Sequence, residues 1–237
     1  MKNLQKMGGI AALYAGVAYI VGMVGFLFVV GWPDDPVQQV AVLVNNQVSL
    51  HILYLIVYQV WAVFLVVLAL ALYERLKAYS PALMQTATAI GIIWATVVIA
   101  SGMIFNIGMN NVVDLYGKDP AQATTVWLVI ESVSDAIGGG NEILGGVWML
   151  LISWAALQAG GLPKALNYLG IAIGAAGILS ALPGLGDVGL VFGLVQIVWF
   201  IWVGIVMLRG SPSVTVERSD ASVTRHGTTS SSTSRPN

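Results

Sequence analysis

Polar residues recur at helical spacing near one end of several otherwise apolar stretches of the chain. Gln47, His51, Tyr54 and Tyr58 follow one another at intervals of four, three and four residues, so an α-helix would carry them all on one face. Amide, imidazole, phenol and carboxylate groups bind ligands through hydrogen bonds and charge. The spacing predicts a polar pocket, whose candidate contacts are His51, Tyr54, Tyr58, Asn106, Asn110, Asn141 and Glu142.

Several kinds of catalytic or cofactor chemistry are disfavoured by the residues that the chain does not have. It contains no Cys and only two His, one of which, His226, lies in a polar C-terminal segment. Thiolate catalysis and haem ligation by two His of one chain are therefore excluded. The sequence has no His-Glu-x-x-His motif, phosphate-binding Gly loop or Gly-x-Ser-x-Gly elbow. We expect no cofactor and no metal site, and the sequence favours a protein that is not an enzyme.

The composition requires a partner for a large apolar surface. Apolar residues make up 57% of the 237 residues and charged residues only 9%, whereas a soluble domain is about 25% charged. A lipid bilayer solvates apolar side chains directly, so the predicted partner is the bilayer. The net charge of −1 gives no reason to expect binding to nucleic acid.

Six stretches are long and apolar enough to be membrane spans. They cover residues 10–30, 51–73, 83–107, 139 or 143 to 159, 166–182 and 188–208. We therefore expect an all-α polytopic helix bundle over residues 1–210. Residues 211–237 are rich in Ser and Thr, which is typical of a disordered tail.

Basic residues give the expected orientation. With six spans, one side of the membrane receives Lys2, Lys6, Arg75, Lys77, Lys164 and Arg209, and the other receives only Lys118. The positive-inside rule then places both termini and the tail in the cytoplasm. The polar candidates would therefore lie in the outer part of the bundle.

Residues 121–137 allow two interpretations. Apolar residues recur there at helical spacing, while Glu131 and Asp135 lie off the apolar face. We favour an amphipathic helix lying in the outer membrane interface. The alternative is a seventh span, which would reverse the later helices and place Lys164 and Arg209 outside.

Small and polar residues within the spans predict how the helices associate. Gly170 and Gly174 form one small-xxx-small pair, and Gly189 and Gly193 form another, so we expect close helix packing or oligomerisation at these glycines. Gln59 and Gln196 are expected to form hydrogen bonds between helices. Trp199 and Trp202 are expected to act as anchors at the membrane interface.

One longer stretch resembles a known family. Residues 140–148, Gly-Asn-Glu-Ile-Leu-Gly-Gly-Val-Trp, together with Trp154, the Gly161-Leu162-Pro163 turn and the Gly/Ala-rich span before Pro183, resemble a bacterial membrane family catalogued as a domain of unknown function, number four-three-eight-six. The resemblance extends over residues 1–208. It implies a six-span protein of the bacterial inner membrane, gives no reaction, and favours a role for Asn141 and Glu142.

The sequence leaves three functional hypotheses. The first is an integral membrane protein that binds a small molecule or a lipid headgroup in an outward-facing polar pocket. The second is a secondary transporter or proton-linked permease that depends on Glu142. The third is an accessory structural subunit that contacts a partner, or another copy of the chain, through its Gly-rich helices.

Overall fold

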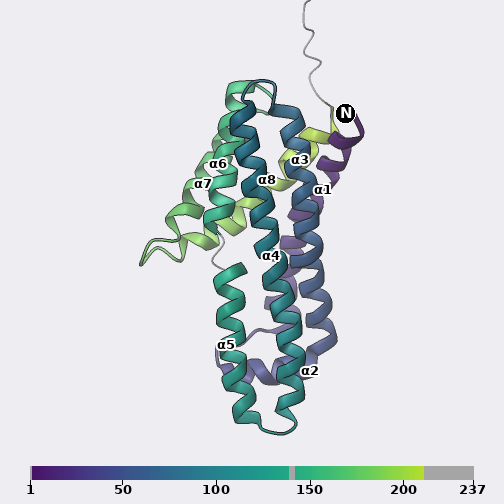
Figure 1. Cartoon of the computed structure of the whole chain (residues 1–237), viewed down its shortest axis with the longest axis vertical. Coiled ribbons are helices and arrows are strands. Elements are labelled where there is room, and N and C mark those ends of the chain that lie inside the picture. Colours follow the sequence, from purple (N-terminus) through teal and green to yellow (C-terminus); the bar gives the residue numbers. More distant parts are fainter. Residues whose placement is uncertain (1, 139–141, 211–237) are drawn as a thin grey trace, which may run out of the picture.

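The computed structural model describes residues 2–138 and 142–210, and in them every regular element is a helix. The helices are α1 (Lys2–Val24), η1 (Gly25–Val30), α2 (Pro36–Tyr54), η2 (Leu55–Val60), α3 (Trp61–Leu76), α4 (Pro81–Tyr116), α5 (Pro120–Gly138), α6 (Glu142–Ala159), α7 (Lys164–Leu179) and α8 (Val188–Leu208). The predicted all-α fold is confirmed (Figure 1). The predicted tail, residues 211–237, lies outside the described residues.

Length and composition make this a multi-pass membrane protein. Among the described residues, five helical stretches are long and apolar enough to cross a bilayer: Asn3–Phe28, Pro36–Leu76, Pro81–Tyr116, Pro120–Ala159 and Val188–Leu208. The apolar helix Lys164–Leu179 is shorter. Lipid can solvate the Leu, Ile and Val side chains that these helices expose.

Two helical stretches are much longer than a bilayer requires. α4 has 36 residues, which correspond to about 54 Å, and Pro36–Leu76 has 41 residues, about 60 Å. The hydrocarbon core is about 30 Å thick, which the 21 residues of α8 match. The molecule thus consists of two parts (Figure 1). A six-helix bundle contains α1, α3, the first half of α4, α6, α7 and α8, and an extension contains α2, the second half of α4 and α5.

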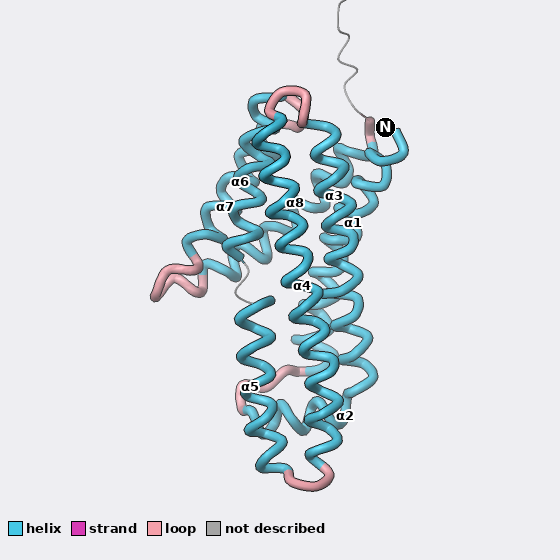
Figure 2. The backbone as a smooth tube through the Cα atoms, in the orientation of Figure 1, coloured by secondary structure: helices cyan, strands magenta, loops and turns pink. Residues whose placement is uncertain are grey.

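The extension differs from the expected interfacial arrangement. α5 packs alongside the second half of α4 and runs parallel to the long axis of the molecule instead of lying across it (Figure 1). The segment that lies across this axis is the first limb of α2, residues 36–45, which ends at a kink with non-helical backbone angles at Asn46 (Figure 2). Asp35 caps this limb by accepting a hydrogen bond from the Val37 backbone N–H.

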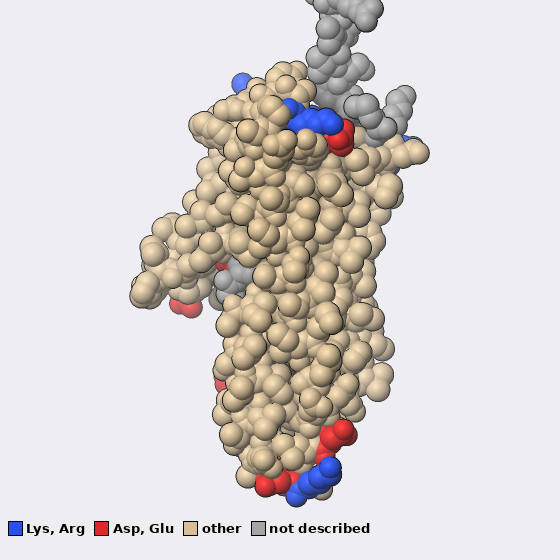
Figure 3. All heavy atoms as spheres, in the orientation of Figure 1, with Lys and Arg blue, Asp and Glu red and all other residues tan. Residues whose placement is uncertain are grey.

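Charged side chains gather at the two ends of the molecule. Figure 3 shows mainly basic side chains at the end where the chain begins, a middle with only a few acidic atoms along one flank, and both acidic and basic side chains at the far end of the extension. The first end, here called the basic end, is formed by the start of α1, the α3–α4 and α6–α7 turns and the end of α8. The six basic residues that the sequence assigns to one side belong to these elements.

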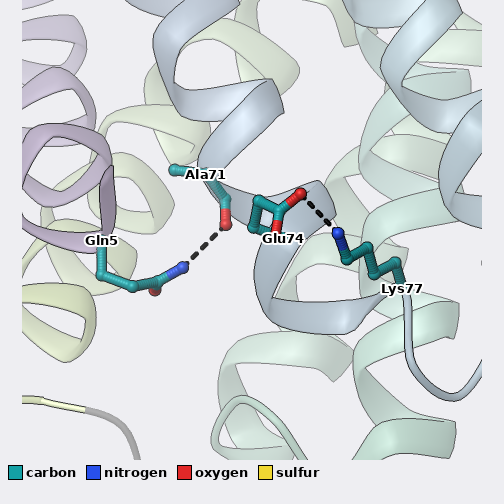
Figure 4. A network of polar contacts seen from close by, with 4 residues as sticks. All are labelled: Gln5, Ala71, Glu74 and Lys77. Atoms are coloured by element: carbon teal, nitrogen blue, oxygen red, sulfur yellow. Dashed lines mark hydrogen bonds and ion pairs between the residues drawn. The ribbon is translucent and has the colours of Figure 1, made fainter. Parts of the chain in front are cut away.

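Arg75 and Gln5 connect three elements at the basic end. Gln5 Nε2 donates a hydrogen bond of 2.9 Å to the Ala71 carbonyl oxygen, which joins α1 to α3 (Figure 4). Arg75 donates from Nη1 to Gln5 Oε1 at 3.2 Å and from Nε to the Gly161 carbonyl oxygen at 2.9 Å, which adds the α6–α7 turn.

The neighbouring ion pair is local to α3. Glu74 and Lys77 lie 2.6 Å apart (Figure 4). The hydrogen bond from Lys77 to the Glu74 carboxylate raises the pKa of Lys77. This pair joins residues three apart in the chain, so Arg75 and Gln5 supply the links between helices.

Candidate functional site

Two cavities lie side by side where the bundle meets the extension. The inner cavity, of about 180 Å³, lies nearer the basic end and is bordered by Tyr19, Trp61, Trp94 and Glu142. The outer cavity, of about 230 Å³, is bordered by Trp32, Phe105, Glu131 and Asp135. Tyr58 belongs to the wall of both, so the two cavities adjoin at this side chain and are here called the joined cavities.

A π-helical segment positions the central residues of this site. The α-helical pattern of α2 changes to the wider π-helix η2 at Leu55 and returns to α-helix at Trp61. Val57 and Tyr58 lie within η2, and Tyr54 and Trp61 directly flank it; all four line one or both cavities. π-Helical turns change the direction of side chains and are frequent at functional sites. The second π-helix, η1, contributes Phe26 to the outer cavity.

Stacked rings form one wall of the outer cavity. The Tyr58 and Tyr54 rings lie 4.7 Å apart with an angle of 9° between their planes, and Tyr54 stacks on Phe105 at 3.4 Å. Trp32, from the loop before α2, lies 6.3 Å from Phe105. Five of the eight lining residues of this cavity are aromatic, and the other three are Glu131, Ser134 and Asp135.

The inner cavity rests on a closed circle of aromatic rings in the bundle. Neighbouring ring centroids lie 5.2 Å apart for Trp61 and Trp94, 5.9 Å for Trp94 and Trp148, 5.8 Å for Trp148 and Trp199, 5.7 Å for Trp199 and Phe200, and 6.1 Å for Phe200 and Trp61. Trp199 is fully buried in this circle. The prediction that it anchors the protein at the membrane interface is therefore wrong, because its side chain faces the other helices.

Three carboxylates border the site. Glu142, in the first turn of α6, lines the inner cavity, while Glu131 and Asp135 of α5 line the outer one. A Cβ atom added to Gly189 would lie 3.5 Å from Glu142 Oε1, so this glycine lies directly against the carboxylate. Among the described residues that line either cavity, none is Lys or Arg.

Several buried polar atoms lie deeper in the bundle without a hydrogen-bond partner among the described residues. Gln196 is fully buried, and both atoms of its amide are unpaired. The same lack of a hydrogen-bond partner among the described residues is found for the indole N–H groups of Trp61, Trp148 and Trp199 and for the Ser153 hydroxyl. The expected hydrogen bond between helices at Gln196 is thus not formed with any described residue, and each such group is costly to bury.

The sequence-predicted site residues divide into three sets. Tyr54, Tyr58 and Glu142 line the joined cavities. Asn106 is buried and lines neither cavity, and its amide Nδ2 lies 3.5 Å from the His51 carbonyl oxygen. The His51 side chain does not line either cavity. Asn110 is farther out on α4, where it accepts a hydrogen bond of 3.0 Å from Gln47. Asn141 lies outside the described residues.

Sequence reasoning did not include most of the aromatic wall or the carboxylates of α5. Tyr19, Trp32, Trp61, Trp94 and Phe105 are aromatic residues in apolar stretches, where core packing is the ordinary expectation. Glu131 and Asp135 were recognisable as acids off an apolar face, four residues apart. That spacing could have suggested a shared environment, but nothing in the sequence places α5 against Tyr54.

The glycine pairs have different roles. Gly170 and Gly174 of α7 face α6, where Ser153 and Leu150 lie against them, so the chain itself covers them. Gly189 and Gly193 line the inner cavity, and no atom lies within 4 Å of a Cβ added to Gly193. The expected packing at Gly193 therefore differs from the structure, because this face of α8 is turned toward a cavity.

Comparison with known proteins gives a family without an assigned activity. A family model described as a domain of unknown function, DUF4386, matches residues 14–210. The chain belongs to this family, so the family inferred from the sequence is confirmed. The comparison with curated proteins found no match, and the comparison with solved structures found none either.

Proposed function

We propose that this member of the DUF4386 family binds a small molecule or a lipid headgroup in the joined inner and outer cavities. The observation that carries the proposal is the shared wall at Tyr58, which lines both cavities and lies between the carboxylate of Glu142 on one side and that of Asp135 on the other. Concave sites with aromatic walls and a few converging polar groups are typical ligand sites. The π-helix η2, which brings Tyr58 to this position, supports the same conclusion.

The orientation of the site follows from the basic end. From the positive-inside rule we infer that this end, where α1 begins and α8 ends, faces the cytoplasm. From the family resemblance we infer that the membrane is a bacterial inner membrane. The inner cavity lies beside the first residues of α6 and α8, Glu142 and Val188, and these two helices reach the basic end only at their other termini. Both cavities therefore lie away from the basic end. Asp135 is exposed as well as cavity-lining, which supports access from the outer side.

Filling the inner cavity tests binding. Gly193→Leu places a side chain where nothing lies within 4 Å, and Gly117→Leu does the same in the open α4–α5 turn, so the second is a matched control. Full-length protein purified in nanodiscs is analysed by native mass spectrometry, alone and with a panel of small molecules and lipids. We expect at least one bound species that is kept by Gly117→Leu and lost by Gly193→Leu. Identical spectra for the three proteins would contradict the proposal.

Transport is the second candidate, and the unpaired polar groups of the bundle favour it. Gln196 lies one helical turn beyond Gly193 on α8, and Trp199 follows. Like Ser153 of α6, they bury unpaired polar atoms between the inner cavity and the basic end. Transport predicts flux into proteoliposomes that falls in both Glu142→Gln and Gln196→Leu. Binding without transport predicts that Gln196→Leu leaves ligand affinity unchanged and that no flux occurs.

A further inference from the structure

We propose that the ligand of the joined cavities is a small organic cation, a molecule or headgroup carrying an ammonium group. This inference rests on the proposed binding function and specifies its chemistry. It is carried by the combination of ring faces, carboxylates and absence of cationic lining residues that the described part of the site presents.

The aromatic walls provide the first argument. A cation is attracted to the face of a Trp, Tyr or Phe ring, and an ammonium group within about 6 Å of the ring centre gains about 0.5–2 kcal/mol. Trp61, Trp94 and Tyr19 border the inner cavity, and Tyr54 and Trp32 border the outer one. The walls of both cavities thus suit the alkyl groups and the charge of an alkylammonium ion.

The charge of the site provides the second argument. Glu142 stands at the inner cavity and Glu131 and Asp135 at the outer one, and no described lining residue offsets them with a positive charge. An anionic ligand would meet three carboxylates beside rings whose faces are also negative. A cation would compensate the carboxylates, which otherwise stand at the edge of an apolar bundle.

The size of the cavities narrows the class of ligand further. The cavities, about 180 and 230 Å³, are each smaller than the roughly 300 Å³ at which pockets for drug-sized ligands begin. Each therefore suits a group the size of a headgroup.

The test compares a cation with its uncharged isostere. Full-length protein in phosphatidylglycerol nanodiscs is titrated by calorimetry with tetramethylammonium, choline and ethanolamine, and with dimethylbutanol, the carbon isostere of choline. We expect at least one ammonium probe to bind and dimethylbutanol to bind at least tenfold more weakly, a difference of about 1.4 kcal/mol. We expect Glu142→Gln or Asp135→Asn to weaken ammonium binding at least tenfold. Asp114→Asn, which removes an exposed carboxylate of the extension, is the control and should not change it.

A second arm separates the two sources of ammonium. In phosphatidylcholine nanodiscs the lipid itself carries the cationic headgroup. Loss of choline binding there, with binding retained in phosphatidylglycerol, would identify a lipid headgroup as the ligand. Equal binding in both would identify a free amine.

The remaining outcomes overturn the inference. Equal binding of choline and dimethylbutanol, or full ammonium affinity in both carboxylate variants, would show that positive charge is not recognised. If no ammonium probe binds while another species is lost in Gly193→Leu, the cation class is wrong and the binding function stands. If no ammonium probe binds and no species distinguishes Gly193→Leu from Gly117→Leu, both proposals fail.

Discussion

A Cβ atom on Gly146 would lie 2.7 Å from the carbonyl oxygen of Gly174, and a Cβ atom on Gly174 would lie 2.7 Å from the carbonyl oxygen of Gly146. The backbones of α6 and α7 therefore touch at this pair. In a bilayer, where lipid removes most of the hydrophobic drive for association, such close approach supplies the packing energy. It also explains how α7, with only 16 residues, is held in the bundle.

Alanine at this contact should destabilise the bundle. For Gly174→Ala, the higher helix propensity of Ala stabilises the folded state by about 1 kcal/mol. Overpacking destabilises it by about 1–3 kcal/mol. The obstructing carbonyl group belongs to the backbone of α6, which cannot rotate away as a side chain could. We expect the free energy of unfolding in detergent to fall by up to about 2 kcal/mol. Gly193→Ala, with no atom within 4 Å, should be neutral or stabilising. Equal effects of the two changes would contradict this account.

Arg75 should matter more to the basic end than Lys77. Arg75→Met removes the hydrogen bonds to Gln5 and Gly161, and hydrogen bonds that involve a charged group are worth about 1.5–3 kcal/mol each in stability. Because Arg75 is only partly buried, solvent offsets part of this loss. We expect the free energy of unfolding to fall by about 2 kcal/mol and hydrogen exchange at the α6–α7 turn to become faster. Lys77→Met breaks only contacts to the nearby residues Tyr73 and Glu74, which link no other helix, and should leave both measurements nearly unchanged. Unchanged hydrogen exchange in Arg75→Met would show that the hydrogen bonds of Arg75 do not stabilise the α6–α7 turn.

A buried hydrogen bond connects the transverse limb of α2 to α5. Trp127 Nε1 donates to Gln39 Oε1 at 2.7 Å, and both residues are buried. Gln39→Leu would leave the indole N–H unpaired at a cost of about 1–3 kcal/mol, so we expect faster hydrogen exchange in residues 36–45 and in α5. Gln38→Leu changes an exposed neighbour of the same size and serves as the control. Equal hydrogen exchange in the two variants would show that the bond between Trp127 and Gln39 does not hold the two segments together.

The orientation can be tested cleanly because the chain has no Cys. Single-cysteine variants at two exposed positions, Lys164→Cys at the basic end and Asp114→Cys in the extension, would be treated in intact cells with a membrane-impermeant maleimide. Cytoplasmic placement of the basic end predicts that Asp114→Cys is labelled and that Lys164→Cys is labelled only after the cells are permeabilised. The reverse pattern would turn the proposed site toward the cytoplasm.

The fold class and the distribution of charge could be predicted from the sequence, because both depend on local stretches of residues. Apolar stretches about 20 residues long, separated by short polar turns, predicted an all-α helix bundle, and the helical spacing of Tyr54 and Tyr58 placed them on one face. The separation of Lys and Arg from the acidic residues also follows from counting along the chain. These predictions succeed because helix periodicity and the cost of crossing lipid depend on local sequence alone.

Only the tertiary structure shows which residues pack against the face that carries Tyr54 and Tyr58. Helical spacing does not say which neighbour lies opposite a residue, so Glu131 and Asp135 could not be placed beside Tyr54, nor Trp94 and Trp148 beside Trp199. The upright position of α5 depends on its packing against a 36-residue α4 that continues beyond the bundle, and on the tie between Trp127 and Gln39. The glycines show the same limit, because Gly174 meets a helix backbone and Gly193 meets a cavity although their local sequences are alike. Which of these environments a residue meets is set by contacts between distant segments, and those contacts exist only once the helices have packed.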